Sequence, residues 1–288
     1  MVFPNRGQFY STYRRQDFAF RDSIMHYIAK NPKSVKLYQK LVQSCKYFFL
    51  KNPILILYEL RYTNFGWGAM SEAKDGWKGL DINNISSKFW ITEGFYGFTG
   101  SNHLVSSMIP KLYKCDAKWL DLVNQIITFD ELLFLASNAE HFDSDGVVVK
   151  YGDDSVVPLE KVVEALPKIK TIGYYCCPTS VTGKTFKELM NIPHFMTLDS
   201  LKLFNVPEEF DLECFYIYMK KNERTEVGLE FGIPLSDGYK IRLNLITDEI
   251  IATQNHDYKP PWIEFYGMDA EKFDQLESIV YNGGQFEE

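Results

Sequence analysis

The chain has 288 residues and a net charge of −7, with 45% hydrophobic and 24% charged residues. These are the proportions of an ordinary folded protein, so disordered, collagen-like and low-complexity chains are excluded. The acidic balance argues against broad binding to phosphate backbones, which requires clustered Lys and Arg, so no nucleic-acid partner is expected.

Five cysteines occur in no spacing typical of a disulfide framework or a zinc site. Reduced thiols in a cytoplasmic or nuclear compartment are therefore expected. The N-terminus lacks a basic region followed by an apolar run, so no signal peptide is expected. The longest apolar stretch, residues 53–58, is much shorter than the ~20 residues of a membrane-spanning helix. We therefore expect no membrane partner.

Residues 18–52 are predicted to form a helical segment. A first short helix carries Ile24, Tyr27 and Ile28 on one face and is ended by an Asn-Pro pair. A second helix begins at the capping residue Ser34 and ends at the next Asn-Pro pair. Its apolar stripe consists of residues spaced three or four apart: Leu37, Leu41, Cys45 and Phe48. Helices this short are unstable alone in water, so they must pack on each other, on the rest of the chain or on a partner.

The rest of the chain divides into two regions. Residues 53–115 are rich in glycine and aromatic residues without a dominant period, and are expected to form a linker or capping region. Residues 116–282 alternate amphipathic helix patterns with strand-like runs that begin at Leu120, Val147, Ile172, Leu201, Val227 and Ile263. The helix patterns cover residues 129–136, behind a capping box at Thr128 and Glu131, and residues 159–166, 212–219, 239–250 and 273–280. This alternation predicts an α/β fold, either as repeats with a parallel sheet or as an ordinary α/β sandwich.

Two of the strand-like runs match the pattern L-x-x-L-x-L-x-x-N/C. The first match, residues 169–177, fills every position and ends on Cys177, whereas the second, residues 198–206, has Asn205 one place early. These residues resemble a leucine-rich repeat, and the other four runs keep only the apolar-x-apolar centre. The resemblance implies a degenerate leucine-rich-repeat-like βα solenoid with a parallel sheet over residues 116–282.

Such a solenoid exposes alternate strand residues on a concave sheet face. The resemblance therefore implies a partner-binding face made of Asp121, Val148, Lys150, Tyr175, Lys202, Phe204, Glu230, Glu264 and Tyr266. Its mixture of aromatic and charged residues is typical of protein-binding surfaces. The alternative is a solvated sheet face that only needs polar residues.

The helical segment closes with residues 42–48, Val-Gln-Ser-Cys-Lys-Tyr-Phe. Together with the apolar faces of the two helices, this ending resembles an F-box, the module that docks on the Skp-family adaptor of cullin-based ubiquitin ligases. Two features depart from the family pattern. Residues 19–20 are Ala-Phe in place of the usual Leu-Pro start, and residues 47–48 are Tyr-Phe in place of the closing Trp.

An F-box followed by a degenerate leucine-rich solenoid is similar to the F-box-like proteins of nematodes. The resemblance implies adaptor-binding residues Ile24, Tyr27, Ile28, Leu37, Leu41, Ser44, Cys45 and Phe48. It also implies a non-enzymatic substrate-recognition adaptor of a cullin-type ubiquitin ligase, with a Skp-family adaptor protein and an unidentified target protein as partners. Two alternatives stay open. One is a stand-alone interaction or structural module whose N-terminal helices only cap the solenoid, and the other is an enzyme without a sequence signature.

No catalytic, metal or cofactor site is predicted. Residues 182–185, Thr-Gly-Lys-Thr, resemble a phosphate loop, but Pro178 stands where that loop needs a glycine N–H, so a helix start near Thr185 is expected instead. Residues 143–146 begin like a calcium loop but lack its later acidic ligands, which favours a simple turn. The adjacent Cys176 and Cys177 and the histidines show neither zinc nor nucleophile spacing. The sequence therefore predicts binding, with no enzyme activity and no cofactor.

Overall fold

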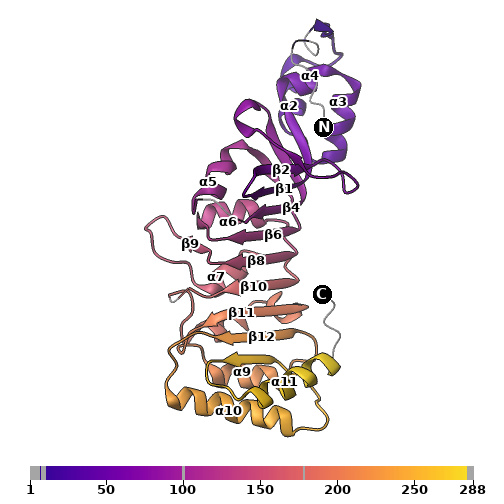
Figure 1. The fold of residues 1–288 in the computed structure, drawn as a ribbon. Coiled ribbons are helices and arrows are strands. Elements are labelled where there is room, and N and C mark those ends of the chain that lie inside the picture. Colours follow the sequence, from indigo (N-terminus) through magenta and orange to yellow (C-terminus); the bar gives the residue numbers. More distant parts are fainter. Residues whose placement is uncertain (1–6, 8–10, 99–100, 178, 284–288) are drawn as a thin grey trace.

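The computed structural model describes residues 7, 11–98, 101–177 and 179–283, and the molecule is elongated (Figure 1). Three helices lie at one end: α2 (Asp22–Lys30), α3 (Val35–Ser44) and α4 (Lys46–Lys51). A large, mostly parallel sheet of eleven strands runs through the rest of the molecule. The predicted α/β class is therefore confirmed.

The large sheet contains β1 (Ile54–Thr63), β2 (Gly66–Met70), β3 (Lys78–Gly79), β4 (Lys88–Gly97), β5 (Leu112–Cys115), β6 (Trp119–Val123), β8 (His141–Asp145), β10 (Thr171–Tyr175), β11 (Ser200–Val206), β12 (Glu226–Phe231) and β13 (Trp262–Phe265). A separate two-stranded sheet contains β7 (Ile126–Thr128) and β9 (Val148–Lys150). The later helices are α5 (Leu104–Met108), α6 (Phe129–Ala136), α7 (Leu159–Glu164), α8 (Thr185–Leu189), α9 (Leu212–Met219), α10 (Asp237–Ala252) and α11 (Ala270–Gly283). Short 3-10 helices are η1 (Ile82–Asn84), η2 (Ile109–Lys111) and η3 (Phe195–Thr197).

The long part of the sheet follows chain order. From β1 through β4, β6, β8, β10, β11 and β12 to β13, each strand pairs in parallel with the next. The strands β2 and β3 extend the sheet beyond β1 in antiparallel pairing, and β5 pairs in parallel with β4. Residues 116–267 thus contain parallel strands that are each followed by a helix, as the spacing of the strand-like runs predicts.

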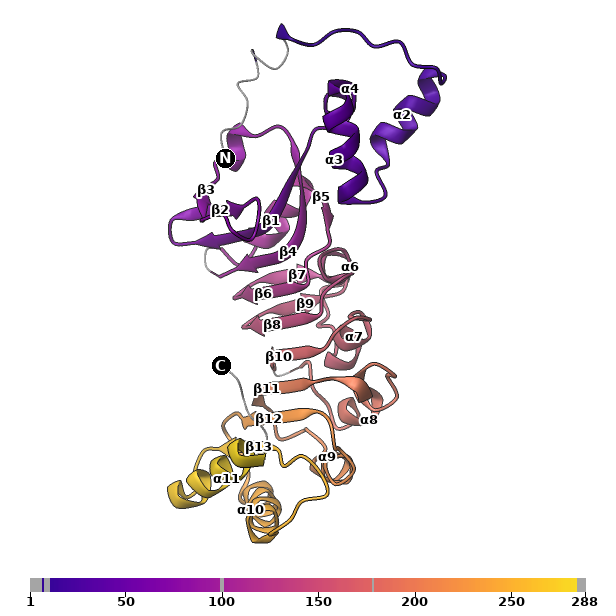
Figure 2. The same cartoon turned by 90° about the vertical axis from the view of Figure 1, so that its right-hand side faces the viewer.

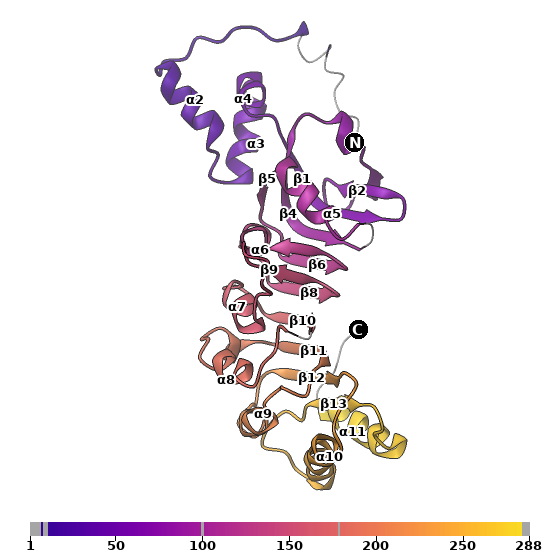
Figure 3. The ribbon, with the colours of Figure 1, turned by 90° about the vertical axis from the view of Figure 1, so that its left-hand side faces the viewer.

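The main core lies on one face of this sheet. In-register core residues on successive strands are at most 3% exposed: Phe95, Leu120, Phe142, Ile172, Leu201 and Val227. The helices α6 to α9 lie in a row along one side of the strands (Figure 2 and Figure 3). Alternation along β11 follows the prediction, because Leu201 and Leu203 are buried while Lys202 is exposed and Phe204 is half-buried.

Local sequence signals placed most of these helices correctly. The helix α6 begins with the expected capping box, in which Thr128 Oγ1 accepts from the N–H of Glu131 at 3.2 Å and Glu131 Oε2 accepts from the N–H of Thr128 at 2.8 Å. The helix α8 begins at Thr185, as expected for the phosphate-loop-like residues. Pro178, on which the prediction against a phosphate loop depends, lies outside the described residues.

The strand expected at residues 147–149 does not belong to the large sheet. The sheet strand at this place is β8, in which Phe142 and Ser144 face the core and polar residues face the other side. Gly146, with φ of +62°, then turns the chain into β9, which pairs with β7. The apolar alternation is real because Val147 and Val149 are buried, but it marks the small sheet. Asp143, Ser144 and Asp145 are consequently strand residues, and the expected turn is limited to Gly146.

The linker expected over residues 53–115 contributes strands to the large sheet. Three consecutive residues of β4 are fully buried because opposite faces of the strand are covered. Phe89 and Ile91 belong to the main core, whereas Trp90 packs with Tyr38 and Ile54 in a separate cluster. A strand that is buried on both faces shows no period of two, which is why the sequence pattern missed it.

The second N-terminal helix is interrupted. Cys45 has an extended backbone, with φ of −158° and ψ of 134°, and separates α3 from α4. Its Sγ accepts a hydrogen bond from the N–H of Tyr47 at 3.3 Å, which caps the start of α4. The single apolar stripe expected from Leu37 to Phe48 is therefore divided between two helices.

Candidate protein-interaction surfaces

The N-terminal helices have a small core of their own. Met25 and Ala29 of α2 pack with Phe48 of α4, and each is at most 5% exposed. Leu41 and Cys45 are half-buried beside them. These five residues hold α2, α3 and α4 together without using the core of the large sheet.

Other apolar residues of this segment face outward. Phe20 is 62% exposed, Ile24 45%, Tyr27 66% and Leu37 42%. We call these four residues the helical surface. Exposed apolar side chains gathered on one short segment are a common feature of protein-binding sites, because their burial against a partner is favourable by about 25 cal/mol per Å².

The predicted adaptor-binding residues are therefore of two kinds. Exposed positions are Ile24, Tyr27, Leu37 and Ser44, and half-buried positions are Ile28, Leu41 and Cys45. Phe48 is only 5% exposed, because it fills the core between α2 and α4. The prediction of Phe48 as a binding residue needs correction for this reason, and Phe20 is an exposed residue that the prediction omitted.

The helices are joined to the sheet through Tyr38. Its hydroxyl donates to the carbonyl of Asn52 at 2.7 Å and accepts from the N–H of Ile54 at 2.9 Å. Burial raises the pKa of this phenol to about 12. Nδ2 of Asn52 also donates to the carbonyl of Ala29 at 3.1 Å. This polar junction fixes how the helical surface is presented relative to the sheet.

The second surface is the open face of the large sheet, on the side opposite its main core. One row of this face consists of in-register residues on successive strands: Arg61, Tyr96, Asp121, Asp143, Gly173, Lys202, Gly228 and Trp262. In the next row, Tyr175 and Phe204 pair in register, as do Glu230 and Glu264. The register between β11 and β12 shifts after the pair Leu203 and Leu229, so the two halves of this row meet at an irregularity in the pairing. Asp145 comes directly after Ser144, the partner of Tyr174, so it belongs to the same row.

The structure brings together most of the predicted partner-binding residues. Tyr175, Lys202, Phe204, Glu230 and Glu264 lie on neighbouring strands of the open face. Tyr266 follows β13 and is 73% exposed. The prediction for Val148 and Lys150 is wrong, because both lie in β9 of the small sheet.

Asp121 of β6 was predicted and lies on this face, but other residues of β6 and β8 were missed. The rings of Trp119 and His141 stack with centroids 3.6 Å apart and planes 8° apart. Nδ1 of His141 lies 2.8 Å from Oγ1 of Thr171, and burial lowers the pKa of the imidazole. The available signal was the alternation of polar residues around Phe142 in β8, which the stronger apolar run at Val147 concealed.

Two carboxylates on this face, Asp121 of β6 and Asp143 of β8, have raised pKa values. Burial, with the neighbouring Asp143 and Asp145, raises the pKa of Asp121 from 3.8 to about 6. Burial also raises the pKa of Asp143, which Lys202 partly opposes. Gly173 lies between Asp143 and Lys202 in the register. A Cβ built on Gly173 would lie 2.0 Å from Oδ1 of Asp143. The glycine therefore leaves the space that the carboxylate of Asp143 occupies.

These residues line a groove of about 310 Å³ on the open face. Its walls include Asp121, Asp143, Asp145, Tyr175, Phe204 and Glu230, and we call these six residues the sheet groove. Beyond the groove, α11 lies on the side of the sheet opposite α6 to α9 (Figure 2). The ring of Phe273 in α11 contacts Trp262 of β13, with centroids 6.1 Å apart. The open face is thus covered at its C-terminal end.

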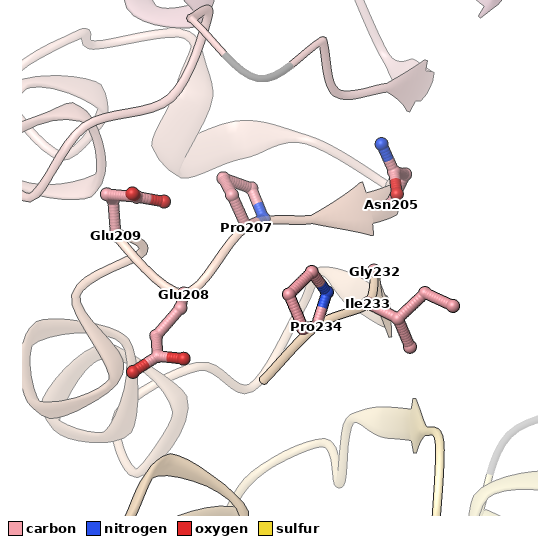
Figure 4. A pocket seen from close by; sticks show the side chains of 7 residues that line it. All are labelled: Asn205, Pro207, Glu208, Glu209, Gly232, Ile233 and Pro234. Atoms are coloured by element: carbon pink, nitrogen blue, oxygen red, sulfur yellow. The ribbon is translucent and has the colours of Figure 1, made fainter. Parts of the chain in front are cut away.

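A larger cavity, of about 610 Å³, lies where β11 and β12 end (Figure 4). Two of its polar side chains, those of Asn205 and Glu208, already have partners. Nδ2 of Asn205 donates to the carbonyl of Cys176 at 3.0 Å, and the carboxylate of Glu208 accepts from the N–H and hydroxyl of Ser236. These bonds support the chain turns around the cavity, and no chemistry follows from them.

Within the part of the chain that the structure describes, no group of three or more His, Cys, Asp or Glu side chains is arranged to hold a metal ion. None of the described helices has the length and apolarity needed to cross a membrane. No family model matches the chain, and no curated protein matches it either. The helical surface and the open face of the sheet are therefore the features of this molecule that bear on its function.

Proposed function

We propose that this protein is a non-enzymatic substrate-recognition adaptor of a cullin-type ubiquitin ligase. The helical surface docks on a Skp-family adaptor, and the open face of a leucine-rich-repeat-like solenoid binds the target protein. The observation that carries the proposal is the division of apolar residues in the N-terminal helices. Met25, Ala29 and Phe48 form an internal core, while Ile24 and Tyr27 of the same segment face outward.

The main alternative is a stand-alone interaction module whose helices only cap the sheet. A cap turns its apolar side chains toward the unit that it covers. Here the contact with the sheet is made mainly by Tyr38 with Ile54 and Trp90, and the helical surface takes no part in it. This arrangement favours docking on a partner over capping. The proposed role implies cytoplasmic or nuclear localisation, where such ligases act.

The test is direct binding of the purified full-length chain to a purified Skp-family adaptor, measured by biolayer interferometry. The double variant Ile24→Ala/Tyr27→Ala is expected to weaken binding by about a hundredfold, because these side chains supply central apolar contacts. A matched control is Ile241→Ala/Leu245→Ala on α10, where the two residues are 61% and 55% exposed. The control is expected to bind like the wild type.

Two results contradict the proposal. One is the absence of adaptor binding by the folded wild-type chain. The other is equal loss of binding in the α2 and α10 variants, which indicates non-specific hydrophobic association. Circular dichroism of each variant establishes that the fold is retained.

A further inference from the structure

Within the proposed function, we propose that the sheet groove binds an extended segment of the target protein in which two basic residues flank an apolar residue, in the pattern basic-x-apolar-x-basic. The groove supplies acidic groups at its two ends and aromatic rings between them. The order of these side chains across the strands matches such a segment.

Four groove residues follow one another on successive strands. Asp145 lies on β8, Tyr175 on β10, Phe204 on β11 and Glu230 on β12. Tyr175 is 39% exposed, and Phe204 is half-buried. The row therefore presents a carboxylate, two accessible aromatic rings and a second carboxylate.

The groove has an excess of negative charge. Asp121 and Asp143 stand beside Asp145 in the neighbouring row. In that row, Arg61 lies two strands from Asp121, and Lys202 lies two strands from Asp143. Among the described residues, Asp121, Asp143, Asp145 and Glu230 form no ion pair with a Lys, Arg or His side chain. Burial disfavours the ionised carboxylates of Asp121 and Asp143, and repulsion by Asp143 and Asp145 adds to this at Asp121, so an incoming cation relieves an existing cost.

The spacing selects an extended segment. Neighbouring strands are about 4.8 Å apart, so Asp145 and Glu230, three strands apart, are separated by about 14 Å. An extended chain rises about 3.3 Å per residue, so residues i and i+4 are about 13 Å apart and project to the same side. Residue i+2 then projects toward Tyr175 and Phe204. The aliphatic stems of Lys or Arg also pack well on aromatic rings.

The experiment uses the full-length chain and a fluorescent peptide, Gly-Arg-Gly-Leu-Gly-Arg-Gly, in fluorescence anisotropy titrations. One control peptide replaces both Arg by Glu. The other, Gly-Arg-Arg-Gly-Leu-Gly-Gly, keeps the composition but places the Arg residues together. We expect binding of the first peptide, weakening with added salt, and at least a fivefold preference over the rearranged peptide.

The double variant Asp145→Asn/Glu230→Gln is expected to reduce affinity by about tenfold or more, since it removes the carboxylates at both ends of the row. The matched control is Glu223→Gln/Asp257→Asn, which neutralises two exposed carboxylates in loops outside the groove. This control is expected to bind the peptide like the wild type. Circular dichroism checks that all variants are folded.

The proposal is overturned if the peptide does not bind at millimolar concentration, if both double variants bind equally, or if the rearranged peptide binds as well as the spaced one. It is also overturned if the wild-type chain dimerises and the groove variant is monomeric, since the occupant is then a second copy. Failure of Skp-family docking is a separate result, because peptide binding is measured without that adaptor. Peptide binding without adaptor docking supports a stand-alone interaction protein with the same partner chemistry.

Discussion

The hydroxyl of Tyr38 accepts a hydrogen bond from the buried backbone N–H of Ile54 at 2.9 Å, directly where β1 begins. This bond links α3 to the first strand of the long parallel part of the sheet. Tyr38 is 2% exposed and Ile54 is 2% exposed, so water cannot easily replace the bond. The junction connects the small core of the N-terminal helices to the first strand of the large sheet.

Replacing Tyr38 by Phe tests this junction. The variant keeps the ring but leaves the N–H of Ile54 without its acceptor, so the free energy of unfolding is expected to fall by about 1–3 kcal/mol. Urea denaturation measures the change. The control Tyr27→Phe removes a hydroxyl from a ring that is 66% exposed, and no change is expected. Equal effects of the two variants contradict a special role for the junction.

The inward and outward faces of α2 give a second prediction. Met25→Ala opens a cavity beside Phe48 and is expected to destabilise the helical segment by about 2–4 kcal/mol. Tyr27→Ala, two positions later, is expected to change stability by no more than about 0.5 kcal/mol. Hydrogen exchange of α2 to α4 measures both effects. A large loss for Tyr27→Ala shows instead that this ring is needed for the fold.

The raised pKa of Asp121 predicts a pH-dependent effect on stability. A carboxyl whose pKa is raised from 3.8 to about 6 by folding destabilises the folded state when it is ionised, above pH 6. Asp121→Asn is therefore expected to raise the free energy of unfolding at pH 7 by about 1 kcal/mol, a value reduced for solvent screening of this half-buried group. The advantage should disappear as the pH falls from 6 to below 3.8.

Thermal denaturation of Asp121→Asn and wild type between pH 3.5 and 8 measures this difference. The control Asp257→Asn lies in an exposed loop and should follow the wild-type profile. A gain for Asp121→Asn that is the same at pH 4 and pH 7 contradicts the electrostatic explanation.

The thiols provide a fourth prediction. All five cysteines are free, so five thiols should react with Ellman's reagent after denaturation without reductant. In the folded chain, Cys115 and Cys176 are fully buried and burial raises the pKa of each thiol to about 12, so neither should react at pH 8. Cys45, Cys177 and Cys214 are partly exposed and should react first. Fewer than five thiols after denaturation contradicts the reduced state.

Several elements were predictable because their signals are local. The capping box of α6 involves residues three apart, and the alternation of Leu201, Lys202 and Leu203 is set within one strand. The helix α10 was predicted from residues on one face of three turns, and its structure extends over that whole range. In each case, neighbouring residues carry enough hydrophobic or hydrogen-bonding preference to select the element.

Other features were decided only by the tertiary structure. The strand β8 has a largely polar sequence and a weak apolar pattern of its own. It forms because its backbone pairs with β6 and β10, which lie far from it in the chain. The burial of Trp90 on the face opposite Phe89 depends on contact with Tyr38, about fifty positions away in the chain. The free energy gained by burying Trp90 arises only when β4 and α3 pack together, so it leaves no periodic pattern in the sequence.

The two candidate surfaces show the same distinction. The sequence by itself determined that α2 is amphipathic and that Tyr175, Phe204 and Glu230 occupy alternate strand positions. Only the tertiary structure decided that Phe48 is internal while Tyr27 is exposed, and that Asp145 completes a row with Tyr175, Phe204 and Glu230. The physical reason is that the packing of helices and the register between strands are set by contacts between residues far apart in the chain, which a local pattern does not contain.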